Sequence, residues 1–322
     1  MRENTYSDNI RLIPKAVIQV DCDGENALSS YYGMERGKGA DKIYPVLLRF
    51  LDIFNRYGIK ATFFVVGKDI EDGMNRRFIV KALDAGHELA NHTYSHPRFF
   101  LKLKKHERIA QILLTQQVLQ KHLGVKAYGF RAPNFELDEE LIEILSGLGL
   151  KYDSSMLSTP FSPLLRTVKR CINIVMDNSR TRSGYLGRAS FSLAPRSVFI
   201  PSKQTVWKKS KKMNGGLNVF EVPIVTSPYG RIPCHASYAL AYPDSFRYAI
   251  TERTIKWYAQ KGFPLVYVFH LCDLCEPEFM YLPESRWYGE FEGRLKFVEW
   301  VCSQLSRNFS CITTLELIEA IF

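Results

Sequence analysis

Short apolar runs alternate with helix-like segments along most of the chain. Runs that are apolar on both faces predict buried strands, and apolar residues repeating every three or four positions predict helices. The expected strands are 16–21, 61–67, 87–92, 128–131, 150–154, 219–225, 265–270 and a short one near 311. The expected helices are 44–57, a stretch through 79–83, 106–123, 139–148, 251–261 and 294–305. This alternation predicts a parallel sheet, either open or closed into a barrel.

Five of the predicted strands end in ionisable side chains. These are Asp21 and Asp23 on the first strand, then His92 with His96, Arg131, Asp153 and His270. A single such residue is commonly a helix cap or an ion pair. In parallel sheets, however, functional groups gather at the carboxyl ends of the strands. Five equivalent positions therefore predict one shared site.

The pair His92 and His96 has a spacing that allows two imidazole nitrogens to bind one metal ion. Taken alone, the pair is as consistent with surface or capping histidines. Thr93 stands where a His-Glu-x-x-His metalloprotease carries its glutamate, which excludes that class. Asp21 and Asp23 flank a single residue, so one carboxylate can bind metal while the other stays free as a base. The position of Gly24 does not fit a calcium-binding loop.

The chain resembles the NodB-homology polysaccharide deacetylases, carbohydrate esterase family 4, which are metal-dependent hydrolases that remove N-acyl groups from sugars. The motifs that carry the resemblance follow in order as VDCDGE, ATFFVVG, GHELANHTYSHP, FRAPNF, YDSSM, EVP and VYVFHLCD. The Asp-x-Asp form of the first motif is similar to the subgroup that includes deacetylases and deformylases of undecaprenyl-phosphate-linked sugars. The family's usual Leu-x-His is replaced here by Val268-Phe269-His270. The resemblance implies an α/β fold, an irregular (β/α) barrel of about seven parallel strands.

The same resemblance implies roles for individual residues. Asp23, His92 and His96 would hold a divalent metal, zinc foremost, although such a donor set also accepts manganese, iron, cobalt or nickel. Asp21, oriented by Arg131, would act as the base, and His270 would protonate the leaving amine.

Further residues are expected around this centre. A backbone N–H near Thr93 or Tyr94 would stabilise the oxyanion. Asp153 and Asp273 are candidate partners of His270 or Arg131, and Asp153 is equally consistent with a turn cap. The candidates for contact with substrate are Thr93, Tyr94, Pro133, Asp153 and Arg247.

The net charge of +10 lies in one segment. Residues 156–216 hold 12 Lys or Arg and one acid, whereas the rest of the chain holds 31 basic and 32 acidic residues. We therefore expect a barrel formed by 1–155 and 217–322, interrupted by a basic insertion at 156–216. An amphipathic stretch at 164–176 and the cluster Trp207–Lys212 predict contact with an anionic membrane surface or a lipid-linked phosphate. A packed helix with a solvated loop explains them as well. No nucleic-acid-binding module is recognisable, so nucleic acid is not an expected partner.

Composition and the amino-terminal segment bear on class and compartment. A hydrophobic fraction of 46% and a charged fraction of 24% are typical of a globular protein. The first apolar run, 16–20, is too short for a signal peptide, and the seven cysteines are consistent with reduced thiols. The expected location is therefore the cytoplasm. If the insertion binds membrane, the protein would be peripheral on the inner face. The expected function is N-deacylation of an amino sugar in cell-envelope or exopolysaccharide synthesis. Two alternatives remain open: an allantoinase-like hydrolase of small amides, and a catalytically silent barrel that binds sugar or membrane.

Overall fold

A curled parallel sheet forms the centre of the molecule. The computed structural model describes residues 13–32, 40–162, 188–210, 217–276 and 289–321. Seven strands follow one another in the spatial order β9 (Leu265–His270), β1 (Lys15–Cys22), β2 (Ala61–Val65), β3 (Glu88–Asn91), β4 (Gly129–Phe130), β5 (Tyr152–Asp153) and β8 (Phe220–Glu221). Every neighbouring pair is parallel.

The two ends of this row approach each other. The N–H of Val225, just after β8, donates to the carbonyl of Val266 on β9 at 3.0 Å. An eighth strand, β10 (Ser310–Ile312), pairs with the first residues of β1, in line with β2. The predicted irregular barrel of about seven parallel strands is confirmed.

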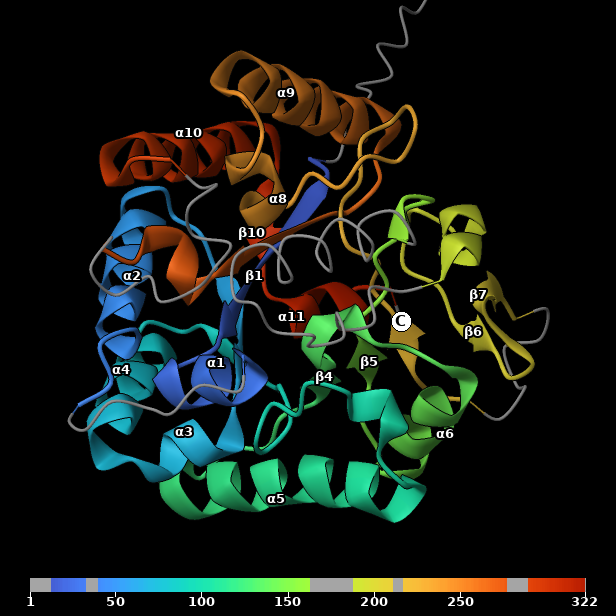
Figure 1. Cartoon of the computed structure of the whole chain (residues 1–322). Coiled ribbons are helices and arrows are strands. Elements are labelled where there is room, and N and C mark those ends of the chain that lie inside the picture. The colour runs from blue at the N-terminus through green and yellow to red at the C-terminus, as the bar shows by residue number, and fades with distance from the viewer. Residues whose placement is uncertain (1–12, 33–39, 163–187, 211–216, 277–288, 322) are drawn as a thin grey trace, which may run out of the picture.

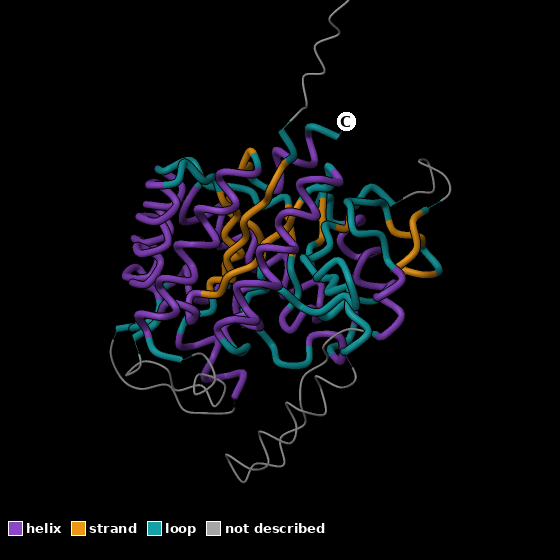
Figure 2. The backbone as a smooth tube through the Cα atoms, turned by 90° about the horizontal axis from the view of Figure 1, so that it is seen from above, coloured by secondary structure: helices purple, strands orange, loops and turns teal. Residues whose placement is uncertain are grey.

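Helices surround the sheet, as Figures 1 and 2 show from two directions. In Figure 1, α5 runs along the lower side, α2 and α4 lie at one flank, and α9 and α10 lie at the top. The described α-helices are α1 (Glu25–Tyr32), α2 (Leu47–Arg56), α3 (Gly67–Glu71), α4 (Gly73–Asp84), α5 (Lys105–Leu123), α6 (Glu139–Gly147), α8 (Ala236–Leu240), α9 (Asp244–Lys261), α10 (Phe291–Asn308) and α11 (Thr314–Glu319). The 3₁₀ turns are η1 (Tyr44–Val46), η2 (Phe100–Lys102), η3 (Pro133–Phe135), η4 (Ala189–Leu193) and η5 (Leu271–Leu274).

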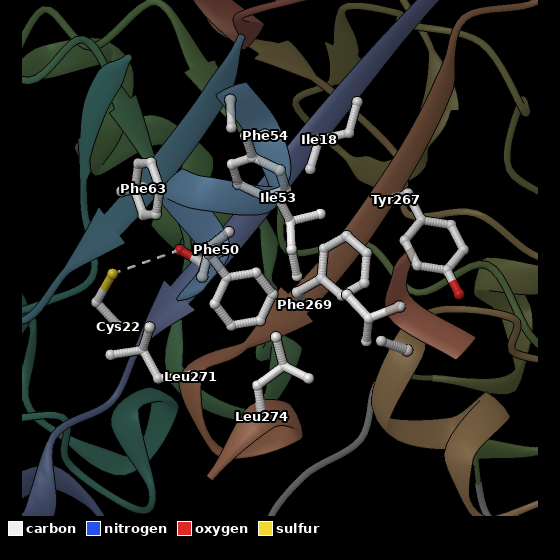
Figure 3. Packing of buried hydrophobic residues seen from close by; sticks show 14 of the residues in the cluster. Ile18, Cys22, Phe50, Ile53, Phe54, Phe63, Tyr267, Phe269, Leu271 and Leu274 are labelled. Carbon is white, nitrogen blue, oxygen red and sulfur yellow. Dashed lines mark hydrogen bonds between the residues drawn. The ribbon is translucent and has the colours of Figure 1, made fainter. Parts of the chain in front are cut away.

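The core between α2 and the sheet is aromatic. Phe50 and Phe54 occupy the buried face of α2 and are fully buried. Their rings lie 5.5 and 6.4 Å from the ring of Phe269 on β9, and Phe54 lies 6.2 Å from Phe63 on β2 (Figure 3). This packing fixes β1, β2 and β9 against the helix layer, and so fixes the strand ends that carry the site.

The strand register brings the ionisable strand ends to one edge of the sheet. Asp21 on β1 pairs directly with His270 on β9. Phe130 on β4 pairs with Asn91 on β3 and with Asp153 on β5. The residues that follow these positions therefore leave the sheet at the same level.

The described part of the basic segment packs on the barrel. Phe191, Phe199 and Val206 are buried in a cluster that includes residues of α6. The hairpin of β6 (Pro201–Ser202) and β7 (Thr205–Lys209) exposes Lys208 and Lys209. The predicted amphipathic stretch 164–176 lies outside the described residues, as do Lys211 and Lys212. Among the helices of the described ranges, none combines the length and hydropathy required to cross a membrane.

Candidate metal and catalytic site

Asp23, His92 and His96 converge at the carboxyl end of the barrel. Asp23 Oδ1 lies 3.3 Å from His92 Nε2 and 3.4 Å from His96 Nε2. One donor atom from each residue lies within 4.8 Å of the other two, and all three side chains are buried. The His92 Nδ1 atom lies 2.8 Å from the Arg131 carbonyl, which leaves Nε2 directed at Asp23.

A strained turn brings the second histidine beside the first. Thr93 and His96 have φ values of 67° and 50°, a region that residues other than glycine rarely adopt. The Asn91 side chain accepts from Thr93 N–H at 2.9 Å, and the Thr93 hydroxyl accepts from His96 N–H at 3.1 Å. These local hydrogen bonds maintain the strained turn, which costs of order 1–3 kcal/mol for each such residue.

Burial and charge shift the pKa values of the three candidate ligands. Burial acts to lower the pKa of His92, but Asp21 and Asp23 outweigh it and raise that pKa. Burial acts to raise the pKa of Asp23, but His96 and His92 outweigh it and hold that pKa below its ordinary value. Burial lowers the pKa of His96 to about 4, so its imidazole is neutral at pH 7. A neutral imidazole and an ionised carboxylate are the forms that bind metal.

The loop after β1 requires glycine at position 24. A Cβ atom on Gly24 would lie 2.6 Å from Asp41 Oδ2 and 2.8 Å from Asp69 Oδ2. Asp69 accepts from the Gly24 N–H at 3.2 Å, and Asp41 accepts from the Glu25 N–H at 2.9 Å. These two buried carboxyls, which our sequence analysis did not identify, hold the backbone that presents Asp23.

Asp21 is held by a buried arginine. Arg131 Nη1 forms an ion pair with Asp21 Oδ1, and both side chains are almost completely buried. The same guanidinium donates from Nε to the Ser154 carbonyl at 2.7 Å and from Nη2 to Gln19 Oε1. Gln19 in turn donates to Thr314 Oγ1 at 3.1 Å, at the start of α11. The structure thus brings Arg131 to Asp21 and adds Gln19, which our sequence analysis did not identify.

His270 lies on the other side of Asp21. His270 Nε2 is 3.4 Å from Asp21 Oδ2. Its Nδ1 lies 2.8 Å from the Ser237 hydroxyl, which donates to Asp273 Oδ1 at 3.0 Å. Asp273 also accepts from the His270 N–H at 2.8 Å. Of the two carboxyls that the sequence offered as partners for His270, the structure brings Asp273 to it.

Three further residues that the sequence predicts near the site, Thr93, Tyr94 and Pro133, lie close to it along the chain. Thr93 and Tyr94 lie in the ligand turn, but their N–H groups donate to Asn91 Oδ1 and Gln111 Oε1, so neither is directed at an oxyanion. Pro133 is buried in η3, directly after the Arg131 strand end.

Asp153 and Arg247 make other contacts. Asp153 accepts from the N–H and hydroxyl of Ser155, and burial raises the pKa of both Asp153 and its neighbour Glu221. Arg247, which the sequence predicts as a substrate contact, is buried on α9. Its guanidinium pairs with Asp244 at 3.1 Å and lies 5.3 Å from the ring of Phe297, because α9 and α10 pack together there.

The donor set fits a divalent metal ion. Two imidazole nitrogens and one carboxylate oxygen converge, and the second nitrogen of His92 is fixed by a backbone carbonyl, as is usual for histidine ligands. Such a set is accepted by zinc and by several other first-row metals. Asp21, Arg131 and His270 adjoin it, so a carboxylate and an imidazole lie beside the candidate metal ligands.

Comparisons with known proteins agree with this arrangement. Residues 41–152 match the family model of polysaccharide deacetylases, a range that includes His92, His96 and Arg131. A peptidoglycan deacetylase of Helicobacter pylori is 35% identical over 116 residues, which are 36% of this chain and 38% of that protein. A peptidoglycan-N-acetylglucosamine deacetylase of Bacillus cereus is 34% identical over 30% of this chain and 34% of its own length. Chitin deacetylase 1 of Cryptococcus neoformans is 30% identical over 41% of this chain and 26% of its own.

The matched region covers about a third of the length of these relatives. A solved structure from Mycobacterium smegmatis, assigned as a polysaccharide deacetylase, shares the fold over 96% of this chain and 90% of its own, with a TM-score of 0.55 and 16% identity. The family match and the deacetylase relatives lead to one conclusion: residues 41–152 of this chain are similar to the polysaccharide deacetylase family.

Proposed function

We propose that this chain is a metal-dependent N-deacylase of an amino sugar. The observation that carries the proposal is the convergence of Asp23, His92 and His96 beside Asp21 and His270 at one barrel edge. The peptidoglycan and chitin deacetylase relatives support an N-acylated amino sugar as the substrate class. Acetyl and formyl are the two acyl groups that we propose to test.

The base and the acid have distinct surroundings. A divalent ion held by Asp23, His92 and His96 would polarise the amide carbonyl and lower the pKa of water toward about 7. Asp21 is fixed on Oδ1 by Arg131, and its Oδ2, which faces His270, would take the proton of the attacking water. The distance of 3.4 Å between Asp21 Oδ2 and His270 Nε2 supports the proposal that both groups act on the same amide.

His270 can deliver a proton to the leaving nitrogen. Its Nδ1–H can donate to the Ser237 hydroxyl, and that hydroxyl donates to Asp273. These two hydrogen bonds orient the imidazole with Nε2 toward Asp21, and they link it to the Asp273 carboxylate, which would stabilise an imidazolium. An amide requires such an acid because an unprotonated amine anion is a poor leaving group.

Acyl release from defined substrates tests this function. We would incubate the zinc-loaded protein with chitotetraose, peptidoglycan fragments and undecaprenyl-phosphate-linked N-acyl sugars, and measure acetate and formate. Asp21→Asn and His270→Ala should lower kcat by at least about 100-fold while zinc remains bound. The surface variants Asp84→Asn and His106→Ala are matched controls and should retain the wild-type rate.

The outcomes separate the alternatives. Wild-type rates in Asp21→Asn or His270→Ala would refute the role assigned to that residue. Hydrolysis of allantoin without acyl release from any sugar would favour the small-amide alternative, and stoichiometric zinc without any hydrolysis would favour a silent barrel.

We also propose a cytoplasmic location, with the basic hairpin contacting an anionic membrane surface that carries a polyprenyl-phosphate-linked substrate. The exposed Lys203, Lys208 and Lys209 and the partly exposed Trp207 support this contact. Each lysine near an anionic surface contributes about 1 kcal/mol. Co-sedimentation with phosphatidylserine vesicles should fall about tenfold or more in Lys208→Glu/Lys209→Glu, but not in the helix-surface control Lys121→Glu. Equal binding to neutral and anionic vesicles would refute the proposal.

A further inference from the structure

His235 is a buried histidine whose ring nitrogens make no hydrogen bonds within the part of the chain that the structure describes. His235 immediately precedes α8 (Ala236–Leu240) and is 1% exposed. Neither Nδ1 nor Nε2 has a hydrogen-bond partner among the described residues. Its ring contacts are aromatic: the centroids of Tyr238 and Phe135 lie 4.7 and 5.4 Å away, both edge-on.

The ring lies beside the proposed catalytic acid. The centroids of His235 and His270 are 6.1 Å apart. Phe135 is a neighbour of both, 6.3 Å from His270, and the Arg131 guanidinium lies 5.8 Å from the Phe135 ring. Phe135 has a φ of 56°, a rare conformation for a bulky residue. His235 therefore adjoins the site on the His270 side, where the sugar bearing the leaving nitrogen would lie.

Without hydrogen-bond partners, the His235 imidazole should lower the stability of the free protein. Burial, His270 and Arg131 lower the pKa of His235 well below its ordinary value, so the ring is neutral. A neutral imidazole offers one N–H donor and one acceptor. Leaving buried polar groups unsatisfied destabilises a protein, whereas an apolar ring of similar shape would not carry that cost. Such groups deserve a functional explanation.

We propose that His235 contacts the substrate, and that its imidazole forms a hydrogen bond with a hydroxyl of the sugar whose nitrogen His270 protonates. The proposal rests on the proposed function, because that function places a sugar at this side of the site. The geometry provides an imidazole that packs edge-on against Phe135 and Tyr238 and lies 6.1 Å from the ring of His270. Aromatic walls with a few placed polar groups are typical of sites for small polar ligands.

Stability and binding should respond to His235→Phe in opposite directions. Without metal, the variant should melt at least about 2 °C above wild type, because two unsatisfied nitrogens are removed. By calorimetry, the metal-free variant should bind chitotetraose about tenfold more weakly than wild type, the loss of one hydrogen bond. His235→Asn, which keeps a donor and an acceptor, should recover part of the affinity. The matched control His106→Phe, on the surface of α5, should bind like wild type.

Deoxygenated substrates identify the partner of the imidazole. Chitotetraose analogues lacking the 3-, 4- or 6-hydroxyl of one residue should include one that wild type binds about tenfold more weakly. His235→Phe should bind that analogue and the parent sugar equally, as expected for a lost pairwise contact.

Two results would overturn the inference. One is unchanged chitotetraose affinity in His235→Phe, and the other is equal penalties for every deoxy analogue in wild type and variant. Weaker binding by the variant in a protein that releases no acyl group would refute the proposed hydrolysis but support the contact. Acyl release by wild type together with unchanged chitotetraose affinity in His235→Phe would support the proposed hydrolysis but refute the contact.

Discussion

The hydrogen bond between Gln19 and Arg131 should couple the barrel interior to Asp21, the proposed base. Gln19→Leu keeps the side chain's approximate size but removes its amide. Arg131 loses the bond from Nη2 to Oε1, the Ser154 hydroxyl loses its bond to Oε1, and Thr314 loses the bond that it accepts at 3.1 Å. Arg131 Nη2 retains the Ser154 hydroxyl at 3.1 Å, and the Thr314 hydroxyl retains Thr62 at 2.9 Å. No partner is therefore left completely unsatisfied.

The magnitude follows from the kind of bond that is lost. A hydrogen bond to a charged group contributes about 1.5–3 kcal/mol and a neutral one about 0.5–1.5 kcal/mol. We expect Gln19→Leu to lower the free energy of unfolding by about 2–4 kcal/mol. Thr314→Val removes only the neutral bonds at the far end and should cost about 1 kcal/mol. Urea unfolding of both metal-free variants measures these values.

Catalysis separates a positioning role for Gln19 from a merely structural one. Arg131 held by fewer bonds orients Asp21 less firmly, so kcat of Gln19→Leu should fall about tenfold while KM changes little. Thr314→Val leaves Arg131 untouched and should retain the wild-type kcat. Equal losses of kcat in the two variants, or no loss in Gln19→Leu, would refute this reasoning.

Three further perturbations test the fold and the site. Gly129→Ala should lower the free energy of unfolding, measured in urea, by about 3 kcal/mol or more, because its Cβ would lie 1.9 Å from Tyr152 Cζ. The control Gly147→Ala, which has open space around it, should leave that free energy unchanged or raise it. Burial lowers the pKa of His87 to about 4, so as pH falls below about 6.5 this imidazole is protonated in the unfolded chain before it is protonated in the folded protein. Between pH 6.5 and 4 the free energy of unfolding of wild type should therefore fall by about 2–3 kcal/mol more than that of His87→Gln. Zinc should raise the thermal midpoint of wild type but not of His96→Ala, and a chelator should reverse the rise; an equal shift in both proteins would contradict the assigned ligands.

Apolar runs predicted the main strands well where the strands pack on helices. The strand at 265–270 has the expected limits, and helix 106–123 ends at Gly124, whose φ is 68°. The runs 128–131 and 150–154 shorten to two paired residues each. The next residues keep one backbone hydrogen bond each, from Arg131 N–H to Asn91 and from Ser154 N–H to Phe130. Beyond that bond Arg131 leads into η3, and Ser154 turns its hydroxyl to Gln19. Sequence periodicity cannot locate such departures, because tertiary hydrogen bonds cause them.

Other site residues carried no local signal. Ser237 lies 33 positions before His270, and only the approach of α8 to the end of β9 brings them together. Asp41 and Asp69 contact the loop at Gly24 from separate segments. The sequence predicts Arg247 as a substrate contact because it lies in the linker before the last helix–strand unit. In the fold its guanidinium lies over the rings of Tyr248 and Phe297.

The first strand shows why an Asp-x-Asp motif fits this barrel. The run Ala16–Cys22 looks uniformly apolar apart from Gln19 and Asp21, yet successive side chains of a strand point to opposite faces. Ile18, Val20 and Cys22 pack in the cluster that contains the rings of α2 (Figure 3). Gln19 and Asp21 point into the barrel toward Arg131, and Asp23 continues on that side toward His92. A carboxylate at position 22 would face the aromatic layer, where burial of an unpaired charge is costly. Spacing the two acids by one residue therefore places both at the mouth of the barrel.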